Sequence, residues 1–162
     1  MKTLLLLRHA KSDWDDPRLR DIERPLAKRG ERDAPRMGKA LKEKGIKPDF
    51  VYCSPAMRAR QTLERFTQAA GIDAEIQFEQ NIYEAASAEL IKLVRHLPNE
   101  RQCVLMVGHN PGFETLLSRL IGESRVMPTA ALGCVTFDID RWEDVEDGQG
   151  KLKWFLIPKA LD

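Results

Sequence analysis

The chain has 162 residues and a net charge of +1 at pH 7, and 43% of its residues are hydrophobic. A chain of this size can bury enough apolar surface to fold without a disulfide or a metal ion, so we expect one domain over residues 1–162. The small net charge excludes bulk electrostatic attraction to nucleic acid or to an anionic membrane.

The cysteines and the N-terminal segment indicate the compartment. Cys53, Cys103 and Cys134 are odd in number and lack a C-x-x-C spacing, which excludes a disulfide framework and a zinc site. The apolar run Thr3–Leu7 ends at Arg8, too early for a signal peptide, and no stretch reaches transmembrane length. We therefore expect a cytoplasmic protein that needs no metal and no cofactor.

Apolar runs of strand length alternate with helical patterns over most of the chain. In chain order, the predicted elements are strand Thr3–Leu7, helix Leu26–Lys44, strand Phe50–Cys53, helix Ser54–Ala70, strand Ala74–Phe78, helix Ala86–Leu97, strand Cys103–Val107, helix Pro111–Ile121, and strands Cys134–Ile139 and Lys151–Ile157. Gly45 and Gly71 end the first two helices. We expect Ser54 to be the N-cap of the second helix and Asn110 to cap the fourth.

This order predicts an α/β fold with a mainly parallel central sheet flanked by helices. Only the polar loop 140–150 separates the last two strands, so we expect antiparallel pairing near the C-terminus. The polar stretch Lys11–Glu23 is the one large loop before the first helix, and loops of that length are often functional.

Basic and nucleophilic side chains follow three of the predicted strands. Arg8 and His9 come after the first strand, and Arg58 lies one turn into the helix after the second. His109 comes after the fourth strand. Open α/β sheets bind ligands beyond the carboxyl ends of their strands, so we expect these side chains to meet there.

Taken singly, each of these residues has a simpler explanation, because a histidine near a strand end is commonly a packed side chain. An arginine early in a helix commonly points to solvent, and most of the other basic residues fit a solvated helix face. His96, late in the third helix, is expected to have a capping or surface role. The convergence of four groups at neighbouring strand ends favours a functional site.

The four groups suit a phosphoryl group. The guanidinium forks of Arg8 and Arg58 match phosphate oxygens, and we expect His109 to add a second, positively charged imidazolium. The helix after Asn110 would bring the positive end of its dipole. His9 can then act as an in-line nucleophile, since a neutral imidazole is nucleophilic near neutral pH.

Several ordered motifs resemble a known family. Leu7-Arg8-His9-Ala10, Ser54-Pro55 with Arg58, and Gly108-His109 resemble the histidine phosphatase superfamily, also called the phosphoglycerate mutase-like or RHG superfamily. Arg8-His9-Ala10-Lys11-Ser12-x-Trp14, Arg24-Pro25-Leu26-x-x-Arg29-Gly30, Ser54-Pro55-x-x-Arg58-Ala59-x-x-Thr62 and Val107-Gly108-His109-Asn110-Pro111 resemble its SixA branch of phosphohistidine phosphatases.

The resemblance implies His9 as the nucleophile, with Arg8, Arg58 and His109 forming the phosphate pocket. Many relatives have a glycine where this chain has Ala10, a departure that is usual in the SixA-like branch. The mutase relatives are longer, with inserted segments over the site, and this chain has little room for such a cover. A mutase activity is therefore not expected.

The proton donor is a separate question. An alkoxide leaving group needs an acid, and Glu84 is the candidate, although a glutamate at a helix N-terminus is also favoured by the dipole alone. Asp13 and Asp21 are weaker candidates, because either could instead order the long loop through an arginine. A phosphohistidine releases an imidazole whose conjugate acid has a pKa of about 6.5, so it needs no strong dedicated acid.

These considerations favour a metal-independent phosphatase that hydrolyses phosphohistidine on a protein through a covalent intermediate on His9. The expected partner is a histidine-containing phosphotransfer domain or a similar signal-transduction protein, with phosphate and other oxyanions binding the same pocket. One alternative is a phosphomonoesterase acting on a small phosphorylated metabolite. A second alternative is a phosphate-binding adaptor without catalysis, which the presence of all four pocket residues disfavours.

Overall fold

The computed structural model describes residues 1–161 and places six strands in one sheet, in the order β3-β2-β4-β1-β5-β6. The strands are β1 (Lys2–Arg8), β2 (Phe50–Cys53), β3 (Glu75–Phe78), β4 (Cys103–Gly108), β5 (Leu132–Phe137) and β6 (Lys151–Leu156). Strands β1 to β4 pair parallel, whereas β5 pairs antiparallel with β1 and with β6. The predicted α/β class, with antiparallel strands near the C-terminus, is confirmed.

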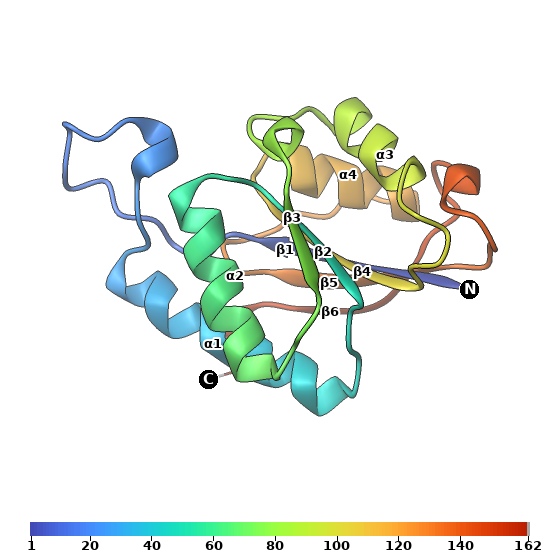
Figure 1. Ribbon diagram of the computed structural model, residues 1–162, viewed down its shortest axis with the longest axis horizontal. Coiled ribbons are helices and arrows are strands. Elements are labelled where there is room, and N and C mark those ends of the chain that lie inside the picture. The colour runs from blue at the N-terminus through green and yellow to red at the C-terminus, as the bar shows by residue number, and fades with distance from the viewer. Residues whose placement is uncertain (162) are drawn as a thin grey trace.

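Helices cover both faces of this sheet. They are α1 (Lys28–Lys44), α2 (Met57–Ala70), α3 (Ser87–Arg95) and α4 (Gly112–Ile121). Helices α1 and α2 lie on one face and α3 and α4 on the other (Figure 1). In β1, Leu5 and Leu7 pack with α1 and α2, and Leu4 and Leu6 pack with α3 and α4. Alternate side chains of a strand point to opposite faces, so a run of leucines fits a strand buried on both sides.

The starts of two helices differ from the sequence prediction. Helix α2 begins at Met57 with Ala56 as its N-cap, so the expectation that Ser54 caps it is wrong. The Ser54 hydroxyl instead accepts the N–H of Ala56 and contacts His109. Helix α4 begins at Gly112 with Pro111 as its N-cap, so Asn110 lies one residue before the N-cap position predicted for it, but its side-chain Oδ1 still accepts the N–H of Glu114 at 3.2 Å.

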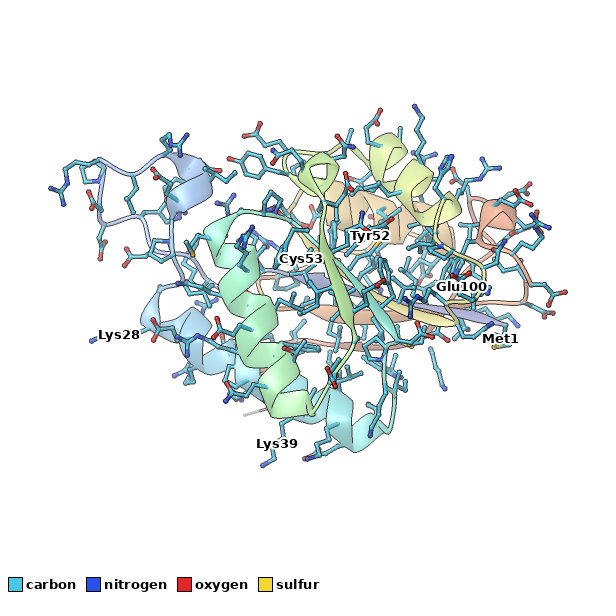
Figure 2. All side chains as sticks on the ribbon, in the orientation of Figure 1. Met1, Lys28, Lys39, Tyr52, Cys53 and Glu100 are labelled. Carbon is cyan, nitrogen blue, oxygen red and sulfur yellow. The ribbon has the colours of Figure 1, made fainter. Side chains whose placement is uncertain are left out.

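Helices α1 and α2 meet by direct backbone contact. A Cβ atom at Gly38 would lie 2.2 Å from the Phe66 carbonyl oxygen, so no larger residue fits there without movement of α1. A Cβ at Gly30 would lie equally close, 2.2 Å, to the carbonyl oxygen of Lys11. Lys28 and Lys39 project from the outer side of α1 (Figure 2). This close packing holds the start of the long loop against the first helix.

Among the helices within residues 1–161, none combines the length and the apolar character that crossing a membrane requires. The cysteines Cys53, Cys103 and Cys134 are all free thiols, and Cys53 and Cys134 are buried.

Candidate active site

The register of the central strands brings the two site histidines together. Arg8 pairs with Gly108 at the ends of β1 and β4, and the His9 N–H donates to the Gly108 carbonyl at 3.0 Å. The rings of His9 and His109 consequently lie 5.1 Å apart between centroids. The neighbouring strand β2 leads into Ser54, and the following helix carries Arg58 to the same edge.

His9 is held in one tautomer. Its side chain is almost fully buried, and its Nδ1 lies 2.8 Å from the Ala10 carbonyl oxygen. A carbonyl only accepts, so Nδ1 carries the proton and Nε2 keeps a lone pair. Burial lowers the pKa of His9 to about 3, aided by the positive charges of Arg58 and Arg8 and opposed by the Ala10 hydrogen bond. The imidazole is therefore neutral and nucleophilic at pH 7.

His109 is also neutral, contrary to the expectation of an imidazolium. Its Nε2 lies 2.7 Å from the Ser54 hydroxyl oxygen, and its buried Nδ1 has no hydrogen-bond partner among residues 1–161. Burial lowers the pKa of His109 to about 4, with Arg58 and Arg8 lowering it further and Asp21 raising it. A buried imidazole beside two guanidiniums does not gain a proton near pH 7.

The two arginines approach the histidines from different elements. The Arg8 guanidinium donates to the Met127 carbonyl at 2.9 Å, and burial lowers its pKa from the ordinary value. Arg58 is 8% exposed and donates from Nη1 to the Asp21 carbonyl at 2.8 Å and from Nη2 to the Asp21 carboxylate at 3.0 Å. The structure thus gathers at one edge of the sheet the four side chains that the sequence singled out.

Asp21 connects the walls of this site. It lies in a short 3₁₀ helix, η1 (Asp21–Glu23), and accepts hydrogen bonds from Arg24 at 2.9 Å and from the Tyr83 hydroxyl at 2.5 Å. The Tyr83 hydrogen bond and the Arg58 charge lower the pKa of Asp21. The carboxylate is ionised at neutral pH and is therefore no proton donor. The alternative expectation, that Asp21 orders the long loop through an arginine, agrees with its bonds to Arg24 and Arg58.

The contacts of Tyr83 with His109 and Asp21 were not predicted from the sequence. Its ring stands edge-on to His109 at 5.6 Å between centroids, and its hydroxyl donates to Asp21. Burial and this hydrogen bond raise the pKa of Tyr83 to about 12, so the phenol stays protonated. The only signal in the sequence was its place directly before Glu84.

The remaining candidates from the sequence are Glu84, Asp13 and His96. Glu84 is exposed, has a φ of 57°, and lines a cavity of about 460 Å³ with His109, Ser87 and Asn110. Asp13 accepts the N–H of Asp15 at 2.7 Å, which orders the loop. His96 is exposed at the end of α3 and donates from Nδ1 to the Lys92 carbonyl at 2.7 Å, which confirms its capping role.

In the part of the chain that the structure describes, no three or more histidine, cysteine, aspartate or glutamate side chains gather as a metal site would require. The positive charge at the site comes from Arg8 and Arg58.

A mainly parallel sheet with two histidines and two arginines at its carboxyl edge is an arrangement that suits an α/β phosphatase. The sequence model of one protein family, the histidine phosphatase superfamily (branch 1), matches residues 4–90, more than half of this 162-residue chain. The chain belongs to the histidine phosphatase superfamily.

Three similar proteins extend this comparison. An uncharacterized chloroplastic protein of Arabidopsis thaliana is 33% identical over 165 aligned residues, which cover 96% of this chain and 75% of that protein. The crystal structure of a candidate phosphohistidine phosphatase SixA from Agrobacterium tumefaciens is 30% identical with a TM-score of 0.84, covering 97% of this chain and 98% of that one. A structure of the protein histidine phosphatase SixA with tungstate is 26% identical with a TM-score of 0.85, covering 99% of both chains.

Proposed function

We propose that this chain hydrolyses phosphohistidine on a partner protein through a phosphorylated intermediate on His9. The observation that carries the proposal is the hydrogen bond from His9 Nδ1 to the Ala10 carbonyl, which leaves the Nε2 lone pair beside two guanidiniums. A neutral, oriented imidazole among cationic donors is the arrangement that phosphoryl transfer to a histidine requires.

The reaction proceeds in two displacements. His9 Nε2 attacks the phosphorus in line with the bond to the substrate imidazole, and that P–N bond breaks as the new one forms. Arg8 and Arg58 donate charged hydrogen bonds to the oxygens of the transferring group, whose charge they stabilise. A water molecule then attacks the phosphorylated His9, which releases inorganic phosphate and restores the free imidazole.

The leaving group favours phosphohistidine as the substrate. An imidazole leaves readily because the free nitrogen of the phosphorylated ring can take a proton from solvent near neutral pH, as an ordinary imidazole does with a pKa of about 6.5. The ring then departs as neutral imidazole without a strong acid beside it. Asp21 accepts hydrogen bonds from Arg58, Arg24 and Tyr83 and is ionised, which leaves Glu84 as the candidate proton donor. The 30% identity to a candidate phosphohistidine phosphatase over nearly the whole chain supports the same substrate class.

The partner we propose is a histidine-containing phosphotransfer domain or a similar cytoplasmic signalling protein. The structure of the protein histidine phosphatase SixA in complex with tungstate, an analogue of phosphate, supports the proposal that this chain binds oxyanions. Arg8, Arg58 and His109 are the residues that would hold the anion here.

A phosphomonoesterase for a small metabolite is the second candidate, and the cavity beside His109 favours it. That cavity is large enough for a small organic leaving group and carries the Glu84 carboxylate on its wall. Such an acid matters for an alkoxide and little for an imidazole.

The deciding experiment compares kcat/KM for phosphohistidine-bearing proteins, free phosphohistidine, aryl phosphates and alkyl phosphates, with a chelator present. We expect the phosphoproteins to be hydrolysed with the highest kcat/KM, and turnover to persist because arginines supply the positive charge. Efficient hydrolysis of alkyl phosphates with none of phosphohistidine would replace the proposal by the second candidate. Binding of anions without any turnover would indicate the adaptor.

A further inference from the structure

Ser54 lies behind His109 and is fully buried at the end of β2. We propose that Ser54 is a positioning residue that fixes the tautomer of His109, so that Nδ1–H faces the reacting phosphoryl group as a hydrogen-bond donor. The role of that donor rests on the proposed function, whereas the tautomer itself does not.

The hydrogen bonds of Ser54 determine the direction of its bond to His109. The Ser54 oxygen already accepts the N–H of Ala56 at 3.2 Å. Its hydroxyl proton must also go to an acceptor, since a buried donor without a partner is destabilising. Among residues 1–161, the one acceptor within reach is Nε2 of His109, 2.7 Å away. Nε2 therefore carries a lone pair, and the proton of the neutral ring lies on Nδ1.

The two histidines then present opposite groups to the site. Both rings carry their proton on Nδ1, but the Ala10 carbonyl holds Nδ1 of His9, whereas Ser54 holds Nε2 of His109. The unpaired atoms are thus a lone pair on His9 and an N–H on His109, whose Nδ1 has no partner within the described residues. The lone pair suits attack on phosphorus, and the N–H suits a phosphoryl oxygen.

The opposite tautomer of His109 would act against catalysis. It would point a lone pair at the anionic phosphoryl oxygens and leave the buried Ser54 hydroxyl without an acceptor. The charged groups around this ring are Arg58, Arg8 and Asp21. None of them bonds to Nδ1 or Nε2, so Ser54 is the side chain that sets the tautomer.

The tautomer can be read by NMR of protein labelled with 15N in its histidine rings. The chain has three histidines, so the variants His9→Gln and His96→Gln suffice to assign the signals. At pH 7 we expect His109 to show a protonated Nδ1 and an unprotonated Nε2, the less common form of histidine in water. A protonated Nε2 on His109 of the wild-type protein would overturn the proposal, whether or not the chain is a phosphatase.

The variant Ser54→Ala tests the consequence. Without the hydroxyl donor, His109 should lose its preference for the Nδ1–H form. We expect tungstate affinity and kcat/KM to fall by about ten- to a hundredfold, as for the loss of one preorganised donor. Thr67→Ala is the matched control, because this hydroxyl lies on α2 and bonds mainly to the Leu63 carbonyl. It should leave the His109 signals, the tungstate affinity and kcat/KM unchanged.

The readouts separate this inference from the proposed function. An Nδ1–H tautomer that is lost in Ser54→Ala together with tungstate affinity supports the inference even if no phosphatase activity is found. Retention of both the tautomer and kcat/KM in Ser54→Ala would contradict it while leaving the phosphatase intact. If Ser54→Ala fails to fold, the wild-type spectrum still decides the tautomer.

Discussion

The His9 imidazole is held at the end of β1 by the carbonyl of its own neighbour, Ala10. Because this bond orients the ring without any other side chain, removing the ring should remove the nucleophile and little else. We expect His9→Ala to lose turnover by at least about 10³-fold while it keeps its fold. Acid-labile phosphate label from the substrate should appear on the wild-type protein and be absent from the variant.

The control for His9→Ala is tungstate binding, which depends on the arginines and His109 and should persist. A variant that binds tungstate yet turns over substrate at the wild-type rate would show that another group is the nucleophile.

Arg58 is almost fully buried, and its guanidinium is fixed by Asp21. Its alanine variant should weaken phosphate, vanadate and tungstate binding by about 1.5–3 kcal/mol, the usual value of a charged hydrogen bond. Arg60→Ala is the matched control, because Arg60 is exposed and donates to the Pro55 carbonyl. Isothermal titration calorimetry would measure the anion affinities of both variants, and an unchanged affinity in Arg58→Ala would remove this residue from the anion site.

Glu84 distinguishes the two substrate classes. If imidazole is the natural leaving group, Glu84→Gln should barely slow phosphohistidine hydrolysis, whereas hydrolysis of an alkyl phosphate should slow by about 10²–10⁴-fold. An aryl phosphate should fall between them. Measured on one preparation, equal losses for all three would mean that Glu84 shapes the site without donating a proton. A large loss confined to phosphohistidine would contradict the leaving-group reasoning.

At the scale of elements, Gly38 controls how closely α1 approaches α2. Its Cβ position is blocked by a backbone carbonyl rather than by a flexible side chain, so the helices must separate to admit a methyl group. We expect Gly38→Ala to lower the free energy of unfolding by about 1–3 kcal/mol, as overpacking does. Gly133→Ala is the control, since its Cβ would meet the Phe155 ring at an ordinary 3.5 Å. Urea denaturation of both variants gives the comparison.

Hydrophobic periodicity predicted the elements because it is a local property. All six strands and four helices were located, with boundaries that shift by at most about three residues, as expected when capping decides the ends. The error at Ser54 has a physical cause. Serine before proline is a typical N-cap, but here the hydroxyl is taken by His109, 55 residues away, and the helix starts at Met57 instead.

At the site, too, local patterns in the sequence were predictive and contacts between distant segments were not. His9, Arg8, Arg58 and His109 follow strands or begin a helix, so their meeting followed from the parallel order of the sheet. The hydrogen bond between Tyr83 and Asp21 spans 62 residues and joins two segments outside the long helices and strands, where hydrophobic periodicity carries no information. The neutral state of His109 was missed for a related reason, because burial is a property of the folded molecule.

For the whole molecule, the buried histidines link stability to pH. Their pKa values of about 3 and 4 in the folded protein lie below the usual value of about 6.5 in an unfolded chain. The unfolded chain therefore binds protons first, and the free energy of unfolding should fall as the pH drops from 7 toward 4. The slope is small at pH 7 and approaches about 1.4 kcal/mol per pH unit for each histidine once the pH lies well below 6.5.

Urea denaturation at pH 7, 6 and 5 measures this slope. His109→Gln should reduce it by about half, since one of the two buried histidines no longer titrates. His96→Gln is the control for the loss of a histidine at the surface. A wild-type stability that is constant between pH 7 and 5 would contradict the neutral, buried state of both rings.

The pairing of β1 with β4 has a consequence for how such a protein can diversify. The distance between the His9 and His109 rings depends on the pairing of Arg8 with Gly108, at the ends of the two central strands β1 and β4. A one-residue insertion in β4 would turn His109 to the other face. The mostly exposed residues 14–20 of the long loop, by contrast, precede Asp21 and can change in length or sequence without moving the reacting pair. Mutational drift in that segment can therefore retarget the protein to a new phosphorylated partner while the phosphoryl chemistry stays the same.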